Sequence, residues 1–294
     1  NLYNFYNPAC NNLEQNKYLY SSYGNYFDGI LKNQSIYFSI NFNSLKKINF
    51  SIIRSSIDNI YNTTNAWNDN GDGIIDITEI DYDNITNFDH NTLGIIISKS
   101  FMLNEKYKIL PIFSDSKIRF GINSKFSFSS LLSEKSFSHS FDLGITYNSS
   151  EYFQYSWAPN IGLLIKDFLP ISYWTTGQIE NKKTSIMVGS SFRLIKNNIT
   201  TKSYNSIFYI NTDLDLSDLM HPSIGLEYEF NNSDNLISFQ INSSYINHSL
   251  GFIIRLKDQV DVAYSFIIPN NNELPSSQKI MIGINTNILN NYIK

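Results

Sequence analysis

The sequence is poor in cysteine, histidine, charge and long apolar runs, and each shortage excludes a class of protein. Cys10 is the single cysteine, so no internal disulfide can form, and the four histidines are too scattered for a zinc site. Charged residues make up 16%, below the roughly 25% typical of soluble domains. The net charge of −4 comes with no basic patch, which argues against a nucleic-acid partner. No apolar run reaches the roughly 18 residues that a membrane-spanning helix needs.

Recognisable catalytic motifs are also missing. The sequence contains no GxSxG, GxGxxG, P-loop or HExxH motif, and Cys10 has no evident catalytic partner. We therefore expect a protein that is not an enzyme, with Cys10 as a small packed residue. No signal peptide is visible before NPAC, which we interpret as a mature chain whose signal has been removed.

What the sequence does have is aromatic residues and strict alternation of apolar and polar positions. Aromatic residues make up 15%, nearly all of them Tyr or Phe. Ile224, Leu226 and Tyr228 alternate with Glu227 and Glu229, which predicts a strand with one apolar and one polar face. The same two-residue period recurs at 117–128, 137–147, 260–268 and 278–288.

These alternating segments number about fourteen, and tilted strands of their length can cross a bilayer. A soluble β-sandwich also alternates, so the pattern by itself leaves that alternative open. Gaps at 57–91, 167–183, 213–221 and 268–277 are long, whereas those at 44–46, 149–151, 231–234 and 257–258 are short. This alternation is typical of outer-membrane barrels, although the long gap at 104–116 breaks it. The predicted strands are 16–26, 35–43, 47–56, 92–103, 117–129, 136–148, 152–166, 184–196, 203–212, 222–230, 235–243, 247–256, 259–267 and 278–289.

We therefore predict an all-β protein, a transmembrane antiparallel β-barrel of about 14 strands in the bacterial outer membrane. The barrel covers residues 16–294 and contacts membrane lipid. Residues 1–15 precede it, as a cap at the periplasmic end or a segment in the lumen. We interpret Arg54, Lys125, Arg193 and Arg255 as lumen charges, and His139 as partner-facing or interfacial because it shares the face of Phe137 and Phe141.

The longest predicted outer loop, 57–91, contains a sequence typical of a calcium-binding loop. Residues 68–79 read NDNGDGIIDITE, and Gly73 stands where the sharp turn of a twelve-residue EF-hand loop falls. Asn68 replaces the usual Asp at the first position, which lowers the expected affinity. The alternative is an Asn/Asp/Gly-rich turn without an ion, but we predict a structural Ca²⁺. Its expected ligands are Asn68, Asn70, Asp72, the Ile74 carbonyl, Asp76 and Glu79.

Short segments recur along the whole chain in one order: Asn7-Pro8-Ala9, 18–30, 57–66, 118–125, 141–147, Lys166-Asp167 with Trp174 and Gly177, 224–228 and 250–256. Taken in this order, they resemble the PorV/PorQ-type outer-membrane proteins, a branch of the FadL-like barrels. Cys10 and residues 238–242 depart from the family pattern. The resemblance implies a fourteen-stranded barrel that serves the type IX secretion system without catalysis.

By this resemblance the protein is a shuttle or adaptor, and its partners are the translocon barrel, a C-terminal signal domain of cargo, or another surface protein. Two alternatives remain open. A FadL-like channel for hydrophobic small molecules would need an apolar lumen, which the polar faces of the strands disfavour. A structural surface protein would assemble through its outer loops and calcium.

Overall fold

The computed structural model describes residues 7–10, 18–41, 47–68, 71, 77–102, 117–148, 157–197, 205–216, 221–231, 235–257, 259–271 and 273–285. Over these ranges the regular structure is almost entirely β-strand. The exceptions are short 3-10 turns: η2 (Pro8–Cys10), η3 (Phe27–Gly29), η4 (Ile77–Glu79) and η5 (Tyr82–Asn84). In this part of the chain no helix is long and apolar enough to span a membrane.

Long antiparallel strands follow one another along the chain, each joined to the next as a hairpin. The strands are β1 (Tyr18–Tyr26), β2 (Leu31–Asn41), β3 (Lys47–Asn62), β4 (Thr86–Met102), β5 (Lys117–Leu131), β6 (Glu134–Asn148), β7 (Trp157–Trp174), β8 (Ile179–Glu180), β9 (Ser185–Asn197), β10 (Asn205–Asp215), β11 (His221–Asn231), β12 (Asn235–Ser244), β13 (Asn247–Leu256), β14 (Val260–Pro269) and β15 (Ser277–Asn285).

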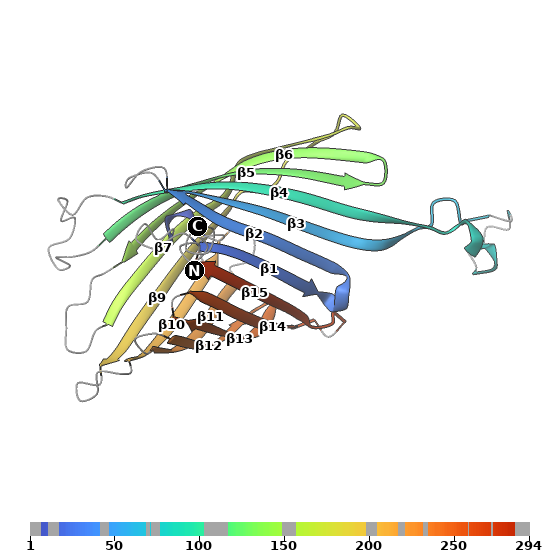
Figure 1. The fold of residues 1–294 in the computed structure, drawn as a ribbon. Helices are drawn as coiled ribbons and strands as arrows, with labels where there is room; N and C mark the ends of the chain where they lie inside the picture. The colour runs from blue at the N-terminus through green and yellow to red at the C-terminus, as the bar shows by residue number, and fades with distance from the viewer. Residues whose placement is uncertain are drawn as a thin grey trace, which may run out of the picture.

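The sheet closes on itself as a barrel of fourteen strands (Figure 1). The first strand pairs with the last, with Tyr18 opposite Asn285. β6 pairs with β7, which joins the two ends of the remaining strand order. The two-residue β8 stands outside the ring and pairs with β7. Closure gives every wall strand a neighbour on both sides, as a barrel in lipid requires.

Polar side chains are buried inside the barrel, while large apolar side chains are exposed on its outside. Asn123 and Ser238 are at most 1% exposed, whereas Leu226 is 42% and Phe239 is 59% exposed. A soluble β-protein would show the opposite arrangement. An apolar outer band around a polar lumen is characteristic of a transmembrane barrel. The predicted fold class, an all-β transmembrane antiparallel barrel of about 14 strands, is therefore confirmed.

Two of the predicted loops are shorter than expected. β3 continues to Asn62 and β4 begins at Thr86, so the connection between them is 63–85 rather than 57–91. β7 continues to Trp174, which makes the predicted loop at 167–183 wrong over its first half. Left-handed residues Asp167 and Leu169 interrupt the alternation in β7, which is why its sequence reads as the end of a strand.

The predicted sorting of long and short connections by barrel end is only partly correct. At the end opposite the termini, 63–85 is long, but Leu132-Ser133 and residues 245–246 are tight turns. At the end that carries the termini, β4 and β5 are separated by 103–116, and β6 and β7 by 149–156. Loop length alone therefore does not distinguish the two ends.

Candidate functional site

The β3–β4 hairpin extends beyond the barrel wall as a two-stranded projection (Figure 1). β2 pairs with β3 only as far as Ile57, and β5 pairs with β4 only as far as His90. Beyond those residues β3 and β4 pair with each other up to Asn62 and Thr86. We call residues 58–89 the projecting hairpin.

A β-bulge marks the base of the projecting hairpin. The register shifts between Ile57 and Ile60, and Asn59 takes a positive φ of 58°. The Asn59 backbone N–H donates to the Asp89 carboxylate across the hairpin at 3.0 Å. Bulges bend a strand and increase its local twist. The bulge therefore sits where the hairpin leaves the wall and sets the direction in which it projects.

The projecting hairpin is acidic and carries large exposed apolar side chains. Tyr61 is 72%, Ile77 70% and Tyr82 62% exposed, and Trp67 is 41% exposed. The sequence of residues 58–89 contains no lysine or arginine and several carboxylates, including Asp81. Exposed aromatic residues of this kind mark interaction surfaces more often than they contribute to folding.

The two ends of the predicted calcium-type loop lie together near the hairpin tip. The Asn68 backbone N–H donates to the Glu79 carbonyl at 2.9 Å, and Trp67 pairs with Ile80 in an isolated antiparallel bridge. The Asp81 N–H donates to the Ala66 carbonyl at 2.8 Å, which extends this closure. The first and twelfth positions of the loop are thus brought side by side, as a closed ligand loop requires.

The fit of a cation to this loop depends on its donor set. Glu79 is 5% exposed, so the carboxylate of the twelfth position lies inward, whereas Asn68 is exposed. The predicted ligands Asn70, Asp72, Ile74 and Asp76 lie outside the described residues. Among the described residues, no group of three or more His, Cys, Asp or Glu side chains is placed to hold a metal. The closed ends and inward carboxylate fit a hard cation, and calcium at this loop stays a prediction.

Residues 7–10 lie against the inner wall of the barrel. A Cβ on Gly121 would stand 2.1 Å from the Pro8 carbonyl carbon, and one on Gly144 would stand 2.0 Å from Asn7 Oδ1. Gly121 and Gly144 are direct cross-strand partners on β5 and β6. These two glycines create the space in which the NPAC backbone touches the wall.

The NPAC turn is itself held together by Asn7. Its carboxamide Oδ1 accepts from the Ala9 N–H at 3.0 Å, and its carbonyl accepts from the Cys10 N–H at 3.0 Å. Its Nδ2 donates to the Leu163 carbonyl on β7 at 3.4 Å. Ala9 is fully buried, and burial raises the pKa of the Cys10 thiol. Sequence reasoning identified the segment but missed the glycines that receive it.

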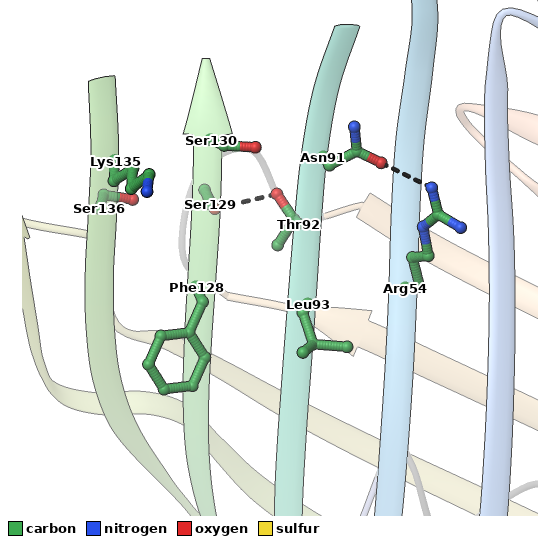
Figure 2. Close-up of a pocket in the computed structure, with 9 residues that line it drawn as sticks. All are labelled: Arg54, Asn91, Thr92, Leu93, Phe128, Ser129, Ser130, Lys135 and Ser136. Atoms are coloured by element: carbon green, nitrogen blue, oxygen red, sulfur yellow. Dashed lines mark hydrogen bonds between the residues drawn. The ribbon is translucent and has the colours of Figure 1, made fainter. Parts of the chain in front are cut away.

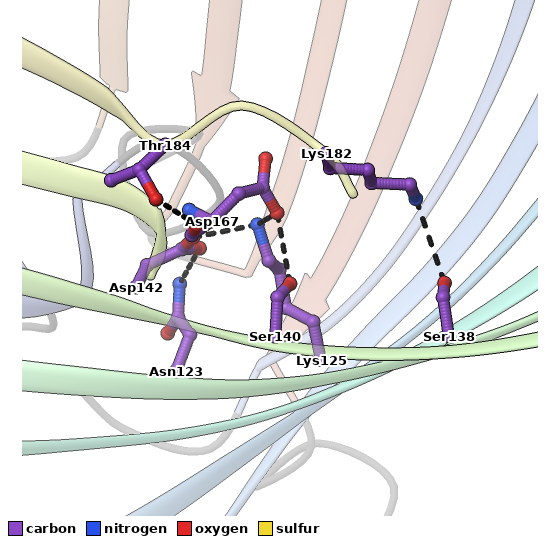
Figure 3. A network of polar contacts seen from close by, with 8 residues as sticks. All are labelled: Asn123, Lys125, Ser138, Ser140, Asp142, Asp167, Lys182 and Thr184. Atoms are coloured by element: carbon purple, nitrogen blue, oxygen red, sulfur yellow. Dashed lines mark hydrogen bonds and ion pairs between the residues drawn. The ribbon is translucent and has the colours of Figure 1, made fainter. Parts of the chain in front are cut away.

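An ion-pair network connects β5, β6 and β7 inside the lumen (Figure 3). Lys125 Nζ lies 2.6 Å from Asp142 Oδ1 and 2.6 Å from Asp167 Oδ1. Asn123 Nδ2 donates to the other Asp142 oxygen at 3.1 Å, and Ser140 Oγ donates to Asp167 at 2.8 Å. Asp142 is 3% exposed, so this lysine compensates a carboxylate that water barely reaches.

The backbone of Asp167 also takes part in the network. Its N–H donates to Asp142 Oδ1 at 3.0 Å, and its carbonyl accepts from Thr184 Oγ1 at 2.8 Å. Asp167 has a φ of 53°, inside the irregular part of the β6–β7 pairing. The bulge turns this carboxylate into the lumen and ties it to the segment that precedes β9. No sequence pattern predicts this contact, because it depends on a break in the two-residue period.

A second buried ion pair lies across β13 and β14. Arg255 Nε donates to Asp261 Oδ1 at 2.8 Å, and its terminal nitrogen donates to Oδ2 at 3.2 Å. Tyr20 Oη donates to Asp261 Oδ2 at 3.1 Å from the far side of β15. Lys125 and Arg255 are therefore lumen charges with carboxylate partners, as predicted. The side chain of Arg193 lies outside the described residues.

Arg54 does not face the lumen, so its interpretation as a lumen charge is wrong. It is paired with Leu93, which is 42% exposed on the outside, whereas Ser51 on the opposite face of β3 is buried. His139 lies on the outer face as predicted, 4.8 Å from the Phe126 ring and 4.5 Å from the Phe141 ring.

Comparison with known proteins finds similar barrel structures but does not assign this chain to a family. No family model matches this chain, and no curated protein matches it. The KdgM porin in complex with disordered oligogalacturonate is 6% identical, with a TM-score of 0.34, over 92% of this chain and 98% of that one. CdiB from Escherichia coli is 7% identical, with a TM-score of 0.47, over 92% and 63%.

OprB of Pseudomonas putida, in its low-pH structure, is 8% identical with a TM-score of 0.40, over 92% of this chain and 91% of that one. Identities and TM-scores this low carry no information about what this chain binds or transports.

Proposed function

We propose that this chain is a non-enzymatic barrel of a bacterial outer membrane that serves as a docking adaptor for proteins at the cell surface. The observation that carries the proposal is the projecting hairpin. It extends past both neighbouring strands and presents Tyr61, Ile77 and Tyr82 to solvent on an acidic background. A hairpin that only closed a wall would need neither the length nor the exposed apolar surface.

The even strand number puts the start of β1 and the end of β15 at the same end of the barrel. In outer-membrane barrels of this kind that end faces the periplasm, so the opposite end faces the cell exterior. The projecting hairpin leaves from that opposite end (Figure 1). In this orientation it is presented to partners outside the cell, and its charge favours a partner with a basic surface.

The resemblance to PorV/PorQ-type proteins gives this adaptor a specific role. By that resemblance it is a type IX secretion shuttle that binds the C-terminal signal domain of cargo or the translocon barrel. Calcium in the loop of residues 68–79 would stiffen the hairpin tip and so reduce the entropy lost on docking. A FadL-like channel for hydrophobic molecules is disfavoured, because most buried side chains of the described lumen wall are polar or ion-paired, and its apolar cluster is limited to Tyr20, Tyr37, Ala263 and Met281.

The test is binding of a purified cargo C-terminal signal domain to the folded barrel in detergent. In one variant, residues 63–85 are replaced by Asn-Gly, a two-residue turn that suits a tight hairpin. We expect wild type to bind and this variant to lose binding at least about tenfold. A matched control replaces the exposed turn at Tyr245-Ile246 with the same Asn-Gly. Equal binding by wild type and the shortened hairpin would contradict the docking role.

A further inference from the structure

A hollow of about 380 Å³ opens on the wall across β3, β4, β5 and β6, at the end away from the termini (Figure 2). Leu93 on β4 and Phe128 on β5 are cross-strand partners and form its apolar part. They are 42% and 47% exposed and belong to the outer apolar face. The hollow is therefore open to whatever surrounds the barrel.

Polar side chains adjoin this apolar part. Arg54 is paired with Leu93, and Ser130 is paired with both Asn91 and Lys135. In Figure 2, Asn91, Ser130 and Lys135 lie above Leu93 and Phe128, and the Arg54 side chain rises from beside Leu93 to Asn91, so that its guanidinium completes a polar row. The hollow thus straddles the edge where the apolar outer band gives way to the polar rim.

The cations of the row are arranged to leave their charge available. Arg54 donates to Asn91 Oδ1 at 3.0 Å, a neutral partner that orients the guanidinium without cancelling its charge. The neighbouring carboxylate of Asp58 is paired with Lys32 Nζ at 2.6 Å and interacts with Arg54 only more weakly. The backbone of Lys135 is fixed by reciprocal hydrogen bonds with Thr175 at 2.9 Å and 3.1 Å. Both cationic side chains therefore extend from a hydrogen-bonded backbone and lie next to an apolar surface.

We infer that this hollow binds the phosphorylated headgroup of lipid A, with one of its acyl chains lying along Leu93 and Phe128. Arg54 and Lys135 are three strand intervals apart, which places their backbones about 15 Å from each other. A disaccharide with a phosphate at each end reaches both cations. The apolar residues lie on the membrane side, where the acyl chains are. This inference rests on the proposed function for the membrane and for the orientation that places the hollow in the outer leaflet.

The experiment titrates the folded, detergent-solubilised barrel with purified diphosphoryl lipid A, dephosphorylated lipid A and phosphatidylglycerol. We expect wild type to bind diphosphoryl lipid A about tenfold more tightly than either other lipid, because dephosphorylated lipid A offers no phosphate and phosphatidylglycerol offers one where diphosphoryl lipid A offers two. In the double variant Arg54→Gln/Lys135→Gln this preference should disappear. The double variant Lys99→Gln/Lys257→Gln removes two cations at the opposite end of the barrel and should keep it.

Each result bears on the inference in a distinct way. An unchanged preference in Arg54→Gln/Lys135→Gln, or equal binding of phosphatidylglycerol and diphosphoryl lipid A by wild type, would overturn it. A gel-mobility shift on heating reports separately whether each protein is a folded barrel. If wild type itself lacks that shift, the proposed function fails first. The variant Phe128→Ser leaves both cations in place, and we expect it to weaken binding of both lipid A forms equally.

Discussion

At the scale of single residues, two glycines in the wall decide how the N-terminal segment sits in the lumen. Gly121 and Gly144 are cross-strand partners, and a Cβ on either would fall about 2 Å from atoms of residues 7 and 8. Real Cβ atoms do not approach other atoms this closely, so any larger residue must displace the segment. The N-terminal segment fits against the wall because these two positions lack a Cβ, rather than because of an attractive contact.

We predict that Gly121→Ala releases the NPAC turn from the wall. Release exposes Cys10, whose raised pKa and burial slow its reaction in the wild type. The rate of maleimide labelling of Cys10 at neutral pH should rise about tenfold, since loss of burial lowers the pKa of the thiol toward its ordinary value and opens the sulfur to the reagent. Gly94→Ala is the matched control, because its nearest neighbours lie 3.7 Å or more from the new Cβ. Wild-type labelling of Gly121→Ala would count against the docked segment.

At the scale of elements, the projecting hairpin differs from the wall strands in what holds it. Its strands pair with each other but lack outer neighbours beyond Ile57 and His90. Two-stranded hairpins are marginally stable in water when isolated. The small closure at its tip, where Asn68 meets Glu79, therefore matters more than a similar turn on the barrel would. A bound cation would supply the missing stability.

We predict that this loop binds Ca²⁺, with terbium as the reporter. Trp67 directly precedes the first ligand position, so excitation of its indole should sensitise Tb³⁺ luminescence, and added Ca²⁺ should remove it. Glu79→Gln removes half of the bidentate carboxylate and should weaken binding about tenfold. Asp83→Asn lies outside the twelve-residue loop and should bind like wild type. Identical titrations of wild type and Glu79→Gln would rule out this ligand role.

At the scale of the whole molecule, the distribution of polarity defines the environment. Buried Asn49, Asn123 and Asp142 face the lumen, while exposed Leu226 and Phe239 face outward. A closed barrel with this distribution has satisfied backbone hydrogen bonds and an apolar surface that lipid can cover. Ion-paired lumen side chains, such as Arg255 with Asp261, compensate buried carboxylates and leave the interior polar.

We predict that a charge on the outer face destabilises the folded barrel in lipid vesicles far more than one outside the wall. Leu226 stands at the centre of β11, and Leu226→Lys should cost roughly 2–4 kcal/mol of unfolding free energy, measured by urea titration. Ile246→Lys places the same charge in an exposed turn and should cost at most about 1 kcal/mol. Similar losses for both variants would argue that lipid does not cover this face.

The sequence alone determined the strands of the barrel wall and their apolar and polar faces, because residues on the two faces of a strand alternate with a two-residue period. The apolar face of Ile224, Leu226 and Tyr228 and the polar face of Glu227 could be assigned without coordinates, and the strand number followed from repetition. Even the placement of His139 followed from its parity. These features are local, so local pattern suffices to predict them.

Only the tertiary structure decided the features that depend on where neighbouring strands end relative to one another, or on β-bulges that break the apolar/polar alternation. The hairpin projects because β2 and β5 end before β3 and β4 do. The sequence of one strand does not show where its neighbours end. Arg54 faces outward because it shares the face of its outward-facing partner Leu93 in the alternation along the strand. A charge is tolerated there because Arg54 lies at the edge of the apolar outer band. Asp167 reaches Lys125 because a bulge breaks the alternation that sequence reasoning relies on.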